Sequence, residues 1–212
     1  MKKYLTLGLA LMCTQILWAQ KVMTEGIVQY SVSVLKGGDN PSVASAFNGA
    51  TQTLFLKSNK AKLDFKSPLR NQSTVYDAQT GNGFIIKQSG SEKYLLELVG
   101  ANWKKYHKRY DGIVFTKEET LKQIAGYTCK KATGKMADGS EVVAYYCTDL
   151  TMMAHGYDPL FGSLPGLVLE YEITNPNGVT VSYQAQSVQM TMVNAAQFEM
   201  PKSGVKVLTF EQ

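Results

Sequence analysis

Apolar and polar residues alternate along much of this chain, with the two-residue period of half-buried β-strands. In the stretch 61–66, for example, Leu63 and Phe65 fall on one face while the charged residues between them fall on the other. Similar runs recur at short intervals and are separated by turn residues such as Gly, Asn, Asp and Ser. The pattern predicts an antiparallel meander with strands at 26–34, 53–57, 61–66, 73–76, 83–87 and 93–98.

The second half of the chain continues the β pattern with more interruptions. A hairpin is predicted around Asp138-Gly139, pairing 127–136 with 141–148, because Asp-Gly is a strong turn signal. Ile113 begins another strand, and the next residues, Thr116 to Glu119, fit either a helix capping box or a bent strand. Two later strands are predicted at 168–173 and 179–192, and the chain leaves the sheet at 198–204.

Two segments depart from the strand pattern. The small-residue-rich stretch 42–49 predicts one or two helical turns that end at Gly49. The stretch from Asp149 to Leu164 is the longest irregular piece, and it is more apolar than a solvated loop needs to be. The length of the chain and its pattern therefore predict a single, mainly β domain over residues 21–212, with one or two short helices.

Residues 1–20 have the order of a secretory signal. Lys2 and Lys3 precede an apolar run that ends at Trp18 and is short for a membrane span. We expect cleavage after Ala19 or Gln20, with an uncleaved anchor as the alternative. Lipid attachment at Cys13 is disfavoured, because Met12 stands where a lipobox has a small residue. The expected location is the periplasm, the outer membrane or the exterior.

Charge adds little to this picture. The formal net charge is +5, and removal of the signal takes away two lysines and no acids, which leaves +3. One dense basic cluster contains Lys104, Lys105, Lys108 and Arg109. It is either a solvated strand or loop face or a contact surface for an acidic partner. No nucleic-acid reader motif accompanies it, so we expect no nucleic-acid partner.

Cys129 and Cys147 are the cysteines that remain after signal removal. They lie symmetrically about Asp138, so the hairpin would bring their sulfurs face to face, and an oxidising compartment would let them form a disulfide. Such a bridge contributes on the order of 3 kcal/mol. A redox pair or a metal site is the alternative, but there is no C-x-x-C spacing and the two histidines, His107 and His155, are not arranged as ligands.

The stretch Gly162-Ser163-Leu164-Pro165-Gly166-Leu167-Val168 resembles the segment that gives the GLPGLI family of Bacteroidetes envelope proteins its name. Here Ser163 replaces a glycine and Val168 an isoleucine. Two further stretches, 126–132 and 198–201, are also similar to that family. The resemblance implies a fold related to LolA- and LolB-like lipoprotein carriers, in which an antiparallel sheet curls into a half-barrel and helices or loops partly close its concave face.

A curled sheet with one open side must fill its concave face with side chains, a lid or an apolar ligand. Apolar residues in and after the irregular piece are candidates to form a lid over an acyl-chain cavity, and Met suits such adaptable contacts. The alternative is that they are ordinary core at the mouth of the half-barrel. The candidate ligand-binding residues are Met152, Met153, Leu160, Phe161, Leu164 and Leu167.

The sequence gives no sign of an enzyme. It lacks G-x-S-x-G, H-E-x-x-H and phosphate-cradling motifs. Glu170 and Glu172 share one strand face and fit two solvent-facing charges better than a catalytic dyad. We therefore expect no catalysis, no cofactor and no metal. Two functions remain: binding of a lipid or lipoprotein in the half-barrel, or interaction of a filled-core protein with an envelope partner through the basic cluster or a sheet edge.

Overall fold

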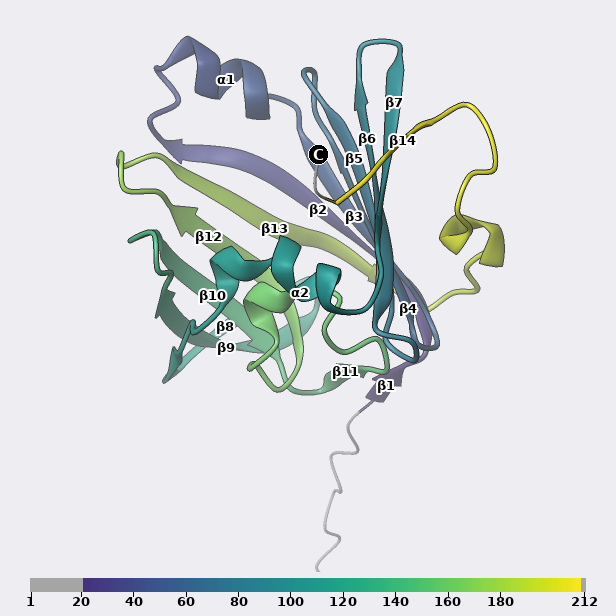
Figure 1. Cartoon of the computed structure of the whole chain (residues 1–212). Helices are drawn as coiled ribbons and strands as arrows, with labels where there is room; N and C mark the ends of the chain where they lie inside the picture. The colour runs from purple at the N-terminus through teal and green to yellow at the C-terminus, as the bar shows by residue number, and fades with distance from the viewer. Residues whose placement is uncertain (1–20, 211–212) are drawn as a thin grey trace, which may run out of the picture.

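The computed structural model describes residues 21–210. It contains a twelve-stranded sheet that curls strongly without closing into a barrel, and a small two-stranded sheet at its base (Figure 1). The predicted signal peptide at 1–20, including Cys13, lies outside the described residues. The strands of the large sheet, in spatial order, are β14 (Lys206–Leu208), β7 (Glu92–Leu98), β6 (Asn82–Ser89), β5 (Asn71–Asp77), β4 (Lys60–Lys66), β3 (Thr51–Lys57), β2 (Glu25–Lys36), β13 (Thr180–Gln189), β12 (Leu167–Thr174), β10 (Glu141–Cys147), β9 (Tyr127–Lys135) and β8 (Phe115–Ile124).

The predicted meander is confirmed. Strands β3 to β7 pair antiparallel with their chain neighbours, and their registers follow the apolar alternation: Leu54 lies opposite Leu63. Leu63 and Phe65 face the concave side, while Lys62 and Asp64 point to the convex side, where they form an ion pair of 3.2 Å. The two-residue period of the sequence therefore decides which side chains line the interior.

Register shifts account for part of the curl. The pairing of β10 with β12 shifts between Tyr145 and Tyr146, where β12 has the extra residue; β13 has one between Ala185 and Ser187, and β8 has extra residues between Lys117 and Leu121. Each extra residue bends its strand and increases the local twist. The shift in β8 also decides between the two interpretations of Thr116 to Glu119: this segment belongs to a bent strand.

Two strand pairings are parallel, whereas the sequence predicted only antiparallel ones. β1 (Lys21–Met23) pairs parallel with β11 (Leu150–Met152) and forms the small sheet. β14 adds parallel to the outer edge of β7. Both pairings join distant parts of the chain, so neither follows from a local pattern.

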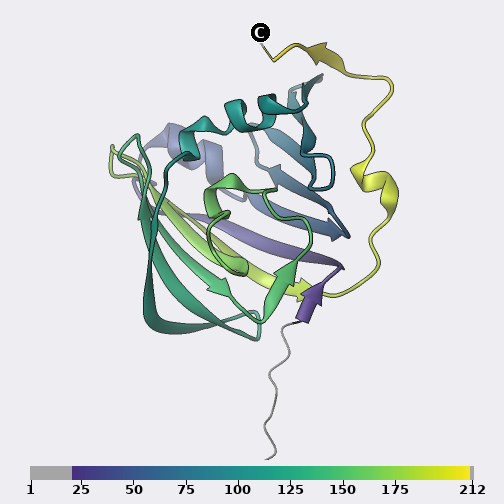
Figure 2. The same cartoon turned by 60° about the horizontal axis from the view of Figure 1, so that its bottom comes forward.

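The helices are short. α1 (Pro41–Phe47) lies where helical turns were predicted; Asn40 caps it by accepting a hydrogen bond from Ser42 N. α2 (Ala101–Tyr106) and the 3₁₀ helix η1 (Lys108–Tyr110) cross the open concave side (Figure 2). α2 was not predicted. Its only buried residue, Trp103, stacks on Tyr76 at 4.5 Å between ring centroids.

The convex face of the meander is apolar too, and the end of the chain covers it. We call residues 190–205 the C-terminal strap; it includes the 3₁₀ helix η3 (Ala195–Phe198) and runs along the outside of the sheet (Figure 1). Val193 and Phe198 of the strap are buried against Val75, Phe84 and Leu95. The core therefore lies on both faces of the meander. No helix in residues 21–210 is long and apolar enough to cross a membrane.

Candidate functional site

The predicted irregular piece forms a lid over the concave face. We call residues 148–166, between β10 and β12, the lid loop; it contains β11 and the 3₁₀ helix η2 (Pro159–Phe161). Its first part is held by the pairing of β11 with β1. η2 is capped by Asp158, whose Oδ1 accepts a hydrogen bond of 3.1 Å from Leu160 N. The lid loop is thus an ordered element fixed at both ends.

Apolar packing holds the middle of the lid loop on the sheet. Leu160, Phe161 and Leu164 are buried in one cluster with residues of β10 and β12. The Phe161 ring meets the Tyr171 ring edge-on, at 4.9 Å between centroids. At the end of the loop, Gly166 lies so close to β10 that a Cβ would stand 2.1 Å from the carbonyl oxygen of Cys147. This close approach explains the glycine that follows Pro165.

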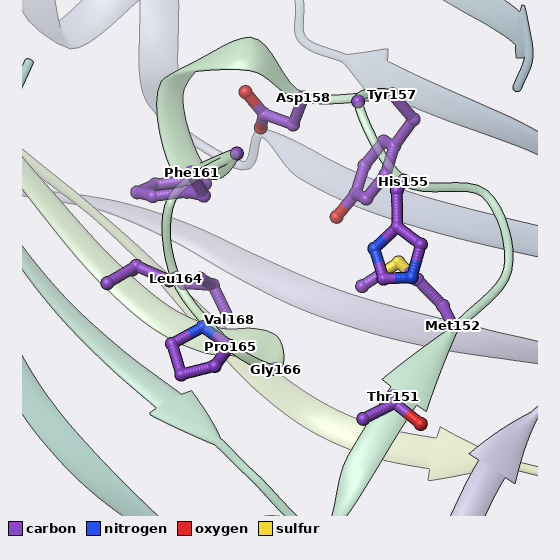
Figure 3. Close-up of a pocket in the computed structure, with 12 residues that line it drawn as sticks. Thr151, Met152, His155, Tyr157, Asp158, Phe161, Leu164, Pro165, Gly166 and Val168 are labelled. Atoms are coloured by element: carbon purple, nitrogen blue, oxygen red, sulfur yellow. The ribbon is translucent and has the colours of Figure 1, made fainter.

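A cavity of about 190 Å³ lies beneath the lid loop (Figure 3). We call it the outer cavity. Its walls are mostly apolar, and His155, Tyr157, Thr151 and Asp158 add polar groups at its margin. The apolar wall is formed by Met152, Phe161, Leu164, Pro165 and Val168.

A second cavity, of about 200 Å³, lies on the other side of Tyr157 and Asp158. We call it the inner cavity. The concave face of β3, β4, β5, β12 and β13 forms its floor, and His107 and Tyr110 close it from the side of α2 and η1. Tyrosines are prominent in its wall: Tyr171 stacks on Tyr183 with 4.4 Å between centroids, and the Tyr171 hydroxyl donates to Gln52 Oε1 at 3.2 Å.

Burial controls the charge state of these groups. It raises the pKa of Tyr183 to about 12 and that of Tyr171 well above the usual range, so both hydroxyls stay protonated. Burial also lowers the pKa of His107, whose Nδ1 lies 2.9 Å from the carbonyl oxygen of Trp103. Asp158 is the exception, because burial raises its pKa only to about 6. At neutral pH it is the one anion in the walls of either cavity.

The predicted ligand-binding residues separate into three groups. Met152, Phe161 and Leu164 line the outer cavity, and Leu160 lines the inner one. Leu167 is fully buried in the core and touches neither cavity. Met153 is 45% exposed and lines neither cavity. Sequence reasoning missed the polar part of the site; the available signal was the tyrosine and aspartate of Tyr157-Asp158-Pro159 within an otherwise apolar loop.

Cys129 and Cys147 are brought together as predicted, but as free, buried thiols. Tyr146 pairs with Lys130 across the hairpin, which places the two cysteines at the next position of the ladder. The interaction between the two thiols lowers the pKa of Cys147 and raises that of Cys129, and Cys129 Sγ lies 3.7 Å from the carbonyl oxygen of Tyr127. The disulfide itself stays a prediction. Among the described residues, no three His, Cys, Asp or Glu side chains are grouped to hold a metal.

The basic cluster lies on helical segments, and not on the strand or loop face that was one of its interpretations. Lys104 and Lys105 belong to α2, and Lys108 and Arg109 to η1; all four are exposed. Arg109 approaches Asp138 at 4.0 Å. The buried ring of Trp103 fixes one side of α2 against the sheet, so the four basic side chains lie on the solvent side.

Glu170 does not face solvent, as the sequence predicted it would. It is 3% exposed and accepts from Lys122 Nζ at 2.6 Å and from Gln184 Nε2 at 2.9 Å. The strand β8 passes over it and supplies Lys122, so its charge is paired within the sheet. Glu172, on the same face, is partly exposed.

No family model matches the sequence, and no curated protein is similar to it. Among solved structures, a crystal structure of PNGF-II superposes with a TM-score of 0.54 and 16% identity, over 88% of this chain and 31% of that one. The chain thus spans about a third of the length of PNGF-II. At this identity the likeness shows a shared fold and nothing about activity.

MucB is also among the structural neighbours. Its complex with MucA(peri) superposes with a TM-score of 0.44 and 9% identity, over 87% of this chain and 57% of MucB. MucB alone gives 0.43 and 9%, over 87% and 60%. Membership of the GLPGLI family rests on the motif and stays a prediction.

Proposed function

We propose that this protein is an exported envelope protein of the GLPGLI type that holds an apolar group beneath its lid loop. The observation that carries the proposal is the outer cavity, which the apolar lid loop and Val168 of β12 line on the concave side of a curled sheet. Exported location rests on the signal-like order of residues 1–20. The ligand would be an acyl chain or another aliphatic group, such as the lipid part of a lipoprotein.

The size of the cavity limits what enters it. Pockets for small molecules usually measure about 300 to 1,000 Å³. The outer cavity, at about 190 Å³, is smaller and suits one short apolar segment. Met152 favours such a ligand, because its unbranched side chain adapts to different apolar shapes.

We propose binding rather than catalysis. Catalytic sites pair a nucleophile with a base that a third group orients. In the walls of the two cavities, Asp158 is engaged in capping η2, and His107 in a bond to the backbone of Trp103. Among the described residues, neither of these groups, nor His155 at the margin of the outer cavity, forms such a pair with a hydroxyl or thiol.

The test is binding of N-phenyl-1-naphthylamine, an uncharged apolar fluorophore, to the purified protein. We expect fluorescence to rise with the wild type and to be lost in Leu164→Trp, which fills the outer cavity. The matched control is Leu121→Trp, at an exposed position on β8 away from both cavities. Equal binding by both variants would contradict the proposed site.

A second candidate function is contact with an acidic envelope partner through the basic cluster. The observation that favours it is the exposed face of α2 and η1, where, among the described residues, Lys104, Lys105 and Lys108 have no carboxylate partner. Charge reversal of the four basic residues should then abolish capture of a partner and leave fluorophore binding unchanged. If neither changes, this surface has no such role.

A further inference from the structure

Tyr157 and Asp158 form a thin wall between the two cavities, since both residues line both spaces. Together the cavities fall within the usual volume range of small-molecule pockets, about 300 to 1,000 Å³, although each alone is below it. They differ in chemistry. The outer cavity is mainly apolar, whereas tyrosines surround the inner one. A ligand that reaches past Tyr157 would therefore meet an apolar space and then an aromatic, polar one.

Asp158 shares the walls of the inner cavity with four tyrosines, Tyr110, Tyr157, Tyr171 and Tyr183. Its charge contributes to the raised pKa of Tyr30, Tyr110 and Tyr157, and also of Tyr171 and Tyr183. The four tyrosines of the inner cavity come from η1, β12, β13 and the lid loop itself. These hydroxyls stay neutral, so none of them balances its charge.

In the part of the chain that the structure describes, no cation pairs with this carboxylate. Within residues 21–210, no Lys, Arg or His nitrogen lies within 4.0 Å of it, although seven other ion pairs form. Its one hydrogen bond comes from Leu160 N. A half-buried carboxylate without a cationic partner is costly, because burial disfavours the charged form.

The other ionisable groups of the inner cavity do not change this balance. His107 is neutral at pH 7, since burial lowers its pKa. Arg70 is charged, but it is exposed at the margin, where its guanidinium carbon lies 5.1 Å from the centre of the Phe65 ring. Its charge acts on Tyr183 and not on Asp158.

We propose that the inner cavity binds an ammonium group, which pairs with the Asp158 carboxylate among the tyrosine rings, while the apolar body of the same ligand occupies the outer cavity. The ligand class is an aliphatic amine. Aromatic faces attract cations, and cages of aromatic rings are a known means of binding ammonium groups. The carboxylate adds an opposite charge in a partly desolvated place. The proposal rests on the proposed function, because the apolar body uses the same outer cavity.

The experiment compares three ligands of equal chain length, octylamine, 1-octanol and octanoate, by calorimetric titration of the full-length protein at pH 7.5. We expect octylamine to bind about tenfold more tightly than 1-octanol. Octanoate should bind most weakly, because its charge repels Asp158.

Asp158→Asn is the decisive variant. Asparagine is also a good N-cap, so its side-chain oxygen can keep accepting from Leu160 N while the charge is lost. The affinity for octylamine should fall to that for 1-octanol, and the affinity for 1-octanol should stay unchanged. Asp111→Asn, at an exposed carboxylate outside both cavities, is the matched control and should leave the preference intact.

The pH dependence gives a second readout. Octylamine stays protonated from pH 5 to 7.5, while Asp158 becomes protonated as the pH falls. His107 and His155 also line the two cavities, and Asp158→Asn keeps both, so the variant controls for them. The preference for octylamine should therefore decrease toward pH 5 in the wild type and stay flat in Asp158→Asn. If octylamine binds no better than 1-octanol, or if the preference survives in the variant, the proposal is wrong and the proposed function stands. If none of the three ligands binds, both fail.

Discussion

The meander β3–β7 and the lid loop enclose the inner cavity from opposite sides, but different contacts hold them in place. Each strand of the meander pairs with its chain neighbour, as Leu54 does with Leu63, so short-range patterns fix its position. The lid loop depends on distant segments: β11 pairs with β1 at the other end of the described chain, and Gly166 fits against Cys147. The cavity wall is therefore locally encoded on one side and assembled by tertiary contacts on the other.

Substitution of Gly166 should disturb the lid most. In Gly166→Ala the new Cβ meets the backbone of Cys147, which cannot move away as a flexible side chain can. We expect a loss of more than about 3 kcal/mol in the free energy of unfolding, measured with urea. Gly162→Ala is the control in the same loop, since its Cβ would lie 3.7 Å from the nearest atom and its φ is −58°. Similar losses in both variants would contradict the role of this close approach.

The cysteine pair tests how the lid is joined to the β9–β10 hairpin, because Cys147 ends β10 directly before the lid loop. Oxidised glutathione should take two electrons and two protons from the thiols and leave a Cys129–Cys147 disulfide. We expect about 3 kcal/mol of added stability, which a reductant removes. Thiol titration of the denatured protein before and after oxidation measures the bond. Cys129→Ala is the control, because it cannot form the bond and should keep its remaining thiol. Free thiols that persist in the wild type after oxidation would contradict the prediction.

Asp158 should make the lid side sensitive to pH. Its pKa is about 6 in the fold against an ordinary value of 3.8, so the folded state holds the proton more tightly. The stabilisation by protonation is complete below about pH 4 and is lost as the pH rises through 6. With allowance for the partly exposed carboxyl, we expect a loss of about 2 kcal/mol. The free energy of unfolding, measured with urea from pH 4 to 7, should fall by this amount in the wild type relative to Asp158→Asn. The same pH dependence in both proteins would contradict the prediction.

The same contrast explains what the sequence could predict. Alternation in segments such as 61–66 identified the meander, and Asp138-Gly139 identified the hairpin. Met152, Phe161 and Leu164 were recognised as cavity residues because they are apolar within an irregular segment. Asp158 was not, because the tyrosines that share the inner cavity with it come from four separate elements that no local pattern brings together.

The two misjudged segments have related causes. α2 has six residues and one buried side chain, so it carries too little apolar periodicity to be found; Trp103 on Tyr76 holds it in place. Glu170 lies in a strand where the alternation of apolar and polar residues predicted a solvent-facing side chain. The bent strand β8 covers it with Lys122, and bends of this kind follow from register shifts that apolar patterns do not reveal.

The most direct test of the central claim is native mass spectrometry of the full-length protein purified from the envelope of the cells that make it. The account predicts a bound apolar molecule on the wild type and on Leu121→Trp, and its absence from Leu164→Trp. A wild-type protein with no bound molecule, or the same molecule on Leu164→Trp, would contradict a ligand beneath the lid loop.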